Sequence, residues 1–151
     1  MIPLFPKFLK EKYCMKGSRN QELAHAWLSR AKDDVLWAQD SFKTQHFSGV
    51  CFLGQQAVEK ALKAYLFLQN EKLIRTHDLL RLLEKCVTYD EVFVELKNAC
   101  IVLSDYYIDT RYPDIWDRDR FDDKKMAEEA LKLTISTIDH IDVIMQKYQK
   151  K

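Results

Sequence analysis

The sequence predicts an all-α fold, an antiparallel up-and-down bundle of about five helices in one domain. Two observations lead to this prediction. Glycine and proline number three each in 151 residues, which is too few for the many turns of an all-β or α/β protein. Apolar residues recur at spacings of three and four along most of the chain, as they do in amphipathic helices.

The beginning of the chain differs from the rest. Residues 1–19 contain two prolines, and five basic side chains stand against the single Glu11. We therefore expect an N-terminal extension over residues 1–19 and a helical bundle over residues 20–151. The first helix is predicted to run to about Thr44, with Ser18 and Gln21 in the arrangement of a capping box. Its apolar stripe consists of Leu23, Trp27, Ala31, Val35, Ala38 and Phe42.

The second helix is predicted from about Phe47 to Asn70. It has two adjacent apolar stripes, one with Val50, Ala57, Ala61, Ala64 and Leu68, the other with Cys51, Val58, Leu62 and Tyr65. Two such stripes indicate a central helix that is contacted on two sides. Gly49 and Gly54 lie within it, and because glycine destabilises a helix, we expect them to allow a close approach by another element.

Two shorter helices follow. Thr76 is the predicted N-cap of the third, with Asp78 in its first turn and a stripe of Leu79, Leu82, Leu83 and Cys86. Asp90 is the predicted cap of the fourth, whose core face contains Val92, Leu96, Ala99, Leu103 and Tyr106. The segment from Ile108 to Asp122 has no apolar period and contains Pro113, so it is predicted to be a loop.

The last helix has a strict alternation of four and three residues between apolar positions, which is the seam of a helix that packs along a partner. Its positions are Ala127, Leu131, Thr134, Ile138, Ile141, Met145 and Tyr148. We expect a bundle of five helices to cover this seam only in part. A second copy of the chain would bury the remainder, so the sequence predicts a homodimer.

Composition limits the possible partners and environments. Lys and Arg total 24 against 23 Asp and Glu, so any contact with a polyanion must be local. The four cysteines are far apart and form no metal or redox pair; we expect three of them to be core residues in a reducing compartment. No apolar run is long enough to cross a membrane, and the prolines interrupt any signal peptide. The sequence therefore predicts a cytoplasmic protein that binds no membrane.

Four segments, in order, resemble the HEPN family (higher eukaryote and prokaryote nucleotide-binding). The stretch Gln55 to Tyr65 is similar to the "QA-EKALKA" signature of that family, and Thr76 to Leu79 to its "HDL" motif. Ala31 to Ala38 resembles the first helix, and Thr110 to Asp114 the "RYPD" loop. The resemblance covers about residues 20–147. It implies a helical bundle, usually dimeric, that acts beside a separate minimal nucleotidyltransferase, often as a toxin–antitoxin pair.

Some relatives are metal-independent ribonucleases that use an arginine and a histidine with four to six residues between them. The resemblance makes Arg111 the matching arginine, with the guanidinium stabilising phosphate charge. The histidine is missing: Trp116, Asp117 and Arg118 stand near its place, and no histidine lies between His77 and His140. Asp117 is an alternative base, but the incomplete motif favours a protein that is not an enzyme.

Six residues are candidates for nucleotide or phosphate binding. Arg111 offers a bidentate donor and Tyr112 a ring for base stacking, although Arg111 could instead pair with Asp105 or Asp109. His77 and Asp78 could form an acid–base pair or only begin a helix. Lys60 and Lys63 could border the same cleft or extend into solvent.

No cofactor and no metal site are predicted. The aspartates around the loop alternate with arginines and lysines, which favours salt bridges over magnesium. Trp27, Trp37 and most other aromatics are interpreted as core.

Three functions remain open. The leading hypothesis is a nucleotide- or nucleic-acid-associated module that acts with a minimal nucleotidyltransferase. The alternatives are an endoribonuclease that uses Arg111 and a structural dimerisation subunit without a ligand.

Overall fold

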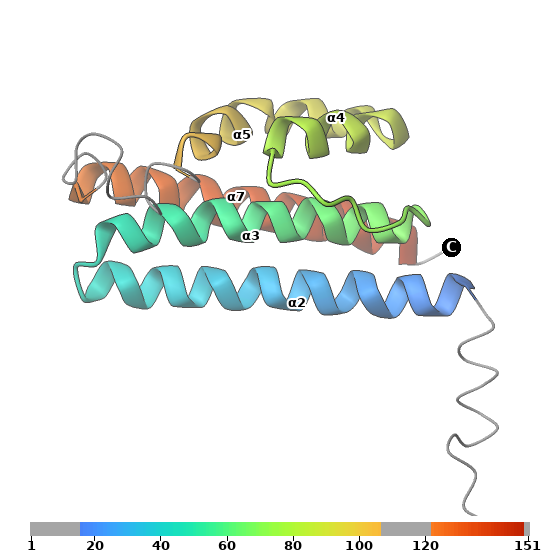
Figure 1. The fold of residues 1–151 in the computed structure, drawn as a ribbon, viewed down its shortest axis with the longest axis horizontal. Helices are drawn as coiled ribbons and strands as arrows, with labels where there is room; N and C mark the ends of the chain where they lie inside the picture. Colours follow the sequence, from blue (N-terminus) through green and yellow to red (C-terminus); the bar gives the residue numbers. More distant parts are fainter. Residues whose placement is uncertain (1–15, 107–121, 150–151) are drawn as a thin grey trace, which may run out of the picture.

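The computed structural model describes residues 16–106 and 122–149. They form α2 (Lys16–Lys43), α3 (Phe47–Leu68), α4 (Leu79–Tyr89), the 3-10 helix η1 (Glu91–Leu96), α5 (Lys97–Ser104) and α7 (Lys124–Gln149) (Figure 1). None of the described residues lies in a strand. The prediction of an all-α helical bundle is confirmed.

The three long helices lie side by side, and α2 runs antiparallel to α3 and α7 (Figure 1). The segment of residues 69–78 returns along α3 without regular structure. It allows α4 to begin near the middle of α3, and α4, η1 and α5 then form a shorter layer over α3 and α7. This return places His77 against α3, since the backbone carbonyl of His77 accepts a hydrogen bond from Gln55 at 3.1 Å.

α3 is the central helix. Both predicted apolar stripes are buried except for the half-buried Leu68. Ala57, Ala61 and Ala64 are fully buried, and the ring of Tyr65 packs against that of Phe93, with the centroids 4.3 Å apart and the planes tilted by 45°. Neighbouring helices bury α3 on several sides. Its polar side chains are therefore held in fixed positions.

The seam of α7 is covered mostly within the chain. Ala127, Thr134, Ile138, Ile141 and Met145 are buried, and α7 packs along α3 with further contacts to α2 and α5. The other two seam positions, Leu131 and Tyr148, are only half-buried. Five helices thus cover the seam in part, with α3 as its main partner, and the homodimer stays a prediction.

Helix ends follow the sequence prediction in part. Asp90 caps η1, because its side chain accepts a hydrogen bond from the Val92 amide. The cap of α4 is Asp78 rather than Thr76, whose hydroxyl instead accepts a bond from the Asp78 amide. The capping box at Ser18 is wrong, since α2 begins at Lys16. The rest of the predicted extension, residues 1–15, lies outside the described residues.

Two further sequence predictions concern burial. Cys51, Cys86 and Cys100 are buried free thiols, as predicted for core residues. Trp27 packs against the core, but Trp37 is 60% exposed, so its interpretation as core was wrong. Across the described helices, none combines the length and the apolar character that a bilayer crossing needs.

Candidate functional site

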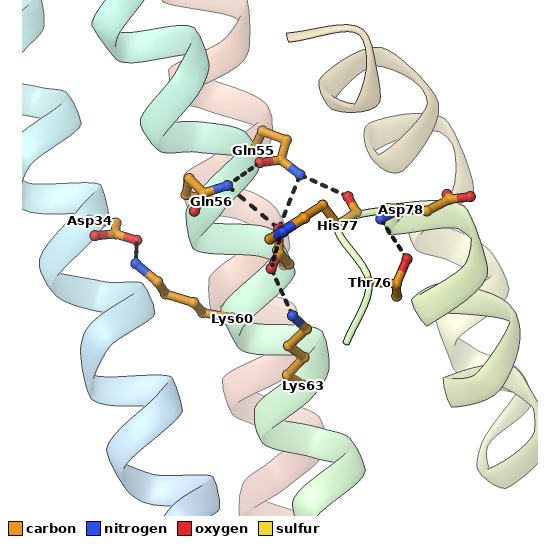
Figure 2. Close-up of polar contacts among 9 residues, drawn as sticks. Asp34, Gln55, Gln56, Lys60, Lys63, Thr76, His77 and Asp78 are labelled. Atoms are coloured by element: carbon orange, nitrogen blue, oxygen red, sulfur yellow. Dashed lines mark hydrogen bonds and ion pairs between the residues drawn. The ribbon is translucent and has the colours of Figure 1, made fainter. Parts of the chain in front are cut away.

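A buried glutamate on α3 organises a cluster of polar side chains. Glu59 is 4% exposed, and its carboxylate accepts a hydrogen bond from Lys63 Nζ at 2.8 Å and contacts Nδ1 of His77 at 3.1 Å (Figure 2). Gln55 and Gln56 also donate toward it, at 3.4 and 3.5 Å. We call Gln55, Gln56, Glu59, Lys63 and His77 the Glu59 cluster.

Helical geometry explains the α3 part of this cluster. Gln55, Glu59 and Lys63 follow one another at intervals of four residues and therefore project from one side of the helix. Gln55 and Glu59 are bridged to the 69–78 segment through the backbone and side chain of His77, respectively. The order glutamate then lysine at this spacing is also the favourable one for an ion pair within a helix.

His77 is the accessible member of the cluster. Its side chain is 58% exposed, whereas those of Glu59 and Lys63 are 5% and 7% exposed. If neutral His77 carries its proton on Nδ1, it donates to Glu59 and Nε2 becomes the basic nitrogen. A buried carboxylate thus orients an exposed imidazole, which is an arrangement suited to proton transfer or to anion binding.

The two lysines have different environments. Lys63 is buried, so the alternative that it extends into solvent was wrong: its ammonium lies between Glu59 and the ring of Trp27, 5.6 Å from the ring centroid. Lys60 is 28% exposed and forms an ion pair with Asp34 of α2, whose side chain is 7% exposed (Figure 2). Lys60 therefore lies on the side of α3 that faces α2. Lys63 connects the Glu59 cluster to the same side, because it contacts both Glu59 and Trp27 of α2.

Asp78 has a structural role in this arrangement. Its carboxylate accepts hydrogen bonds from the amides of Leu80 and Arg81, at 3.0 and 3.2 Å, and so caps α4. This cap fixes the start of α4 directly after His77 and thereby helps to position the imidazole.

Arg111, Tyr112 and Asp117 lie outside the described residues, as does most of the aspartate-rich loop. Within residues 16–106 and 122–149, no group of three or more His, Cys, Asp or Glu side chains is arranged to hold a metal ion.

Sequence reasoning singled out His77, Lys60 and Lys63 but missed their anionic partners. Glu59 and Asp34 both lie in segments that the family resemblance identified. The signal available was the i, i+4 spacing of Glu59 and Lys63 on a helix with apolar neighbours. The contact between Asp34 and Lys60 joins residues 26 positions apart and had no such local signal.

Comparisons with known proteins agree with this architecture. Residues 24–142 match the model of the HEPN domain family. The chain is 28% identical over 145 residues to "Putative toxin MJ1304" of Methanocaldococcus jannaschii, an alignment that covers 87% of this chain and 95% of that protein. The crystal structure of TT1696 from Thermus thermophilus is 34% identical, with a TM-score of 0.70 over 79% of this chain and 95% of that one.

A further solved structure is similar in fold. ST0689, described as an archaeal HEPN homologue, is 24% identical, with a TM-score of 0.63 over 79% of this chain and 94% of that chain.

Proposed function

Because the chain belongs to the HEPN family, we propose that it is a nucleotide- or RNA-binding module that acts as the toxin-like half of a two-protein system. Its partner in this proposal is a minimal nucleotidyltransferase. The pair would act in the cytoplasm, where RNA and nucleotides are available, and the module would act as a homodimer.

The Glu59 cluster is the observation on which this proposal depends. Burying the charges of Glu59 and Lys63 is unfavourable, and a pair of apolar side chains would often stabilise a core as well or better. Here the buried pair holds the exposed imidazole of His77 at a fixed position. A ligand that contacts His77 would explain why the chain retains a buried ion pair that does not favour stability. The imidazole and the nearby ammonium groups favour an anion such as a phosphate.

The toxin-like role is supported by the relative in Methanocaldococcus jannaschii, whose name is "Putative toxin MJ1304" and which aligns over nearly its whole length. Arg111 and Tyr112 would add a phosphate contact and a stacking ring to the same function.

The proposal is tested by expression and by binding. Inducible expression of the chain in a bacterial host should arrest growth, and co-expression with the protein encoded beside it should restore growth. Purified protein should bind a short single-stranded oligoribonucleotide, with an affinity that falls as salt rises because phosphate contacts dominate. If neither growth arrest nor RNA or nucleotide binding occurs, the proposal fails.

A metal-independent endoribonuclease is the second candidate. One observation favours it: the imidazole that the segment after Arg111 lacks is present at His77, oriented by Glu59. In this reaction the imidazole would accept the proton of the 2′-hydroxyl, whose oxygen attacks the adjacent phosphate to form a 2′,3′-cyclic phosphate. The bond from phosphorus to the 5′ oxygen breaks, and that oxygen takes up a proton from water and leaves as a 5′-hydroxyl.

The enzyme candidate predicts RNA cleavage in the presence of EDTA that is lost in both Arg111→Ala and His77→Ala. Cleavage that persists in these variants would come from a contaminant. If the wild-type protein bound RNA without cleaving it, the chain would act as a binding module and not as a ribonuclease. A structural dimerisation subunit would be indicated if the protein were dimeric but bound no ligand.

A further inference from the structure

A small pocket opens beside the Lys63 end of the Glu59 cluster. Its volume is about 200 Å³, and it is lined by Ala26, Trp27 and Arg30 of α2 and by Lys60 of α3. The ammonium of Lys63 lies between Glu59 and the Trp27 ring, so the pocket adjoins the cluster. None of the four lining residues belongs to the cluster, and the pocket is therefore a separate feature of the surface.

Trp27 gives the pocket an aromatic wall that is held in place. Its ring packs against that of Phe67, with the centroids 5.9 Å apart and the planes tilted by 38°. The residue is half-buried, so part of the ring system is accessible from the pocket. A fixed indole is a favourable surface for stacking a planar heteroaromatic ring, and such stacking tolerates any nucleobase.

Positive charge surrounds this aromatic wall. The ammonium of Lys60 is anchored by the buried carboxylate of Asp34. Arg30 is exposed, and no residue in the described part of the chain forms an ion pair with it. An arginine without a counter-ion beside an aromatic wall can bind a phosphate with two parallel hydrogen bonds.

We propose that this pocket binds a nucleotide, with the heteroaromatic ring against Trp27 and the phosphate at Arg30. Its volume lies below the roughly 300–1,000 Å³ of pockets for drug-sized ligands, so it would take one ring system and leave the sugar and phosphate at the rim. The inference rests on the proposed function and extends it: an unpaired base of single-stranded RNA would occupy this pocket while the neighbouring backbone passes the Glu59 cluster.

The test uses the full chain and three probes: 5′-AMP, adenosine and a short oligoribonucleotide. The indole N–H signals of the protein are followed by NMR, with Trp37→Phe and Trp116→Phe used for assignment. We expect 5′-AMP to shift the Trp27 signal and adenosine to bind more weakly. Arg30→Gln should weaken 5′-AMP and the oligoribonucleotide about tenfold or more, the usual effect of losing a charged hydrogen bond.

Lys43→Gln is the matched control, because it removes one positive charge from the far end of the same helix and should leave affinity unchanged. If Arg30→Gln and Lys43→Gln lost the same affinity, the effect would be one of net charge, and the proposed binding in this pocket would be overturned. RNA binding that leaves the Trp27 signal and the Arg30→Gln affinity unchanged would also overturn it, while the proposed function would stand. Absence of any nucleotide or RNA binding would overturn both.

Discussion

Nδ1 of His77 lies 3.1 Å from a carboxylate oxygen of Glu59, although the two residues are 18 positions apart in the sequence. This contact joins the irregular segment before α4 to the central helix. It is reinforced by the bond from Gln55 to the backbone carbonyl of His77. The position of the imidazole is thus set by two side chains of α3, both of which are buried.

The buried pair of Glu59 and Lys63 should be sensitive to loss of one charge. Replacing Glu59 by Gln leaves the Lys63 ammonium buried without its counter-charge, and we expect the free energy of unfolding to fall by about 3–5 kcal/mol. Glu128→Gln is the control, since Glu128 and Lys132 form an exposed pair with the same i, i+4 spacing. It should lose at most about 0.5 kcal/mol. Urea unfolding followed by circular dichroism measures both, and similar losses would contradict the prediction.

The two glycines of α3 should respond oppositely to alanine. A Cβ at Gly54 would lie 2.5 Å from Oγ1 of the buried Thr134, so Gly54→Ala should destabilise the fold by about 1–3 kcal/mol. At Gly49 the nearest atoms are 3.9 Å away, and Gly49→Ala should stabilise it by about 0.5–1 kcal/mol because alanine is the better helix former. Thermal unfolding distinguishes the two. Adding Thr134→Ala to Gly54→Ala should restore part of the loss, since the clashing oxygen is removed.

Asp78 allows capping to be separated from ligand binding. Asp78→Ala removes the acceptor for the amides of Leu80 and Arg81, and we expect a loss of about 1 kcal/mol in the free energy of unfolding. Asp78→Ser retains a capping oxygen and should retain the stability. If nucleotide affinity fell in a stable Asp78→Ser protein, the carboxylate itself would contact the ligand. Unchanged affinity would leave Asp78 as a cap.

Stability should decline in alkaline solution because of the buried thiols. Burial raises the pKa of Cys51 and that of Cys100 to about 12 from an ordinary value of 9.0. Between these pH values the unfolded chain loses thiol protons that the folded chain retains, so unfolding is favoured as pH rises above about 9. Urea midpoints measured from about pH 8 to about pH 11 should show a smaller decline in Cys100→Ala than in the wild type. An identical decline would mean that other groups cause it.

The helices could be predicted because buried apolar residues recur along them at regular spacings. The stripes of α3 and α7 place apolar side chains at spacings that only a helix brings to one face, and the start of α3 at Phe47 was correct. Helix ends were less certain, because Thr76 and Asp78 are both good caps and only the path of the 69–78 segment selects Asp78.

The site could be predicted only in part. His77 follows from its place before α4, and Lys63 from the family signature. Lys63 is buried because its ammonium contacts two partners: the ring of Trp27, which belongs to another helix, and the carboxylate of Glu59. Such contacts between distant elements have no local pattern. Trp37 is a different case, because it lies outside the apolar stripe of α2 and has polar residues three and four positions away on both sides, so the local pattern agrees with its exposure.

The contrast between two histidines tests the site directly. His77 and His140 each contact a glutamate: His77 meets the buried Glu59, and Nε2 of His140 lies 3.6 Å from Glu95, which is 67% exposed. We expect His77→Ala to weaken oligoribonucleotide binding about tenfold or more, as for a hydrogen bond to a charged group. Because the imidazole is more than half exposed, the fold should survive, and circular dichroism can verify this.

His140→Ala should bind RNA as the wild type does, since its glutamate partner is solvated and holds no fixed geometry. The same pair of variants applies to growth arrest, which should be relieved by His77→Ala alone. Equal binding by both variants would mean that Glu59 orients His77 only to attach the segment before α4 to α3, and the ligand site would then lie elsewhere on the bundle.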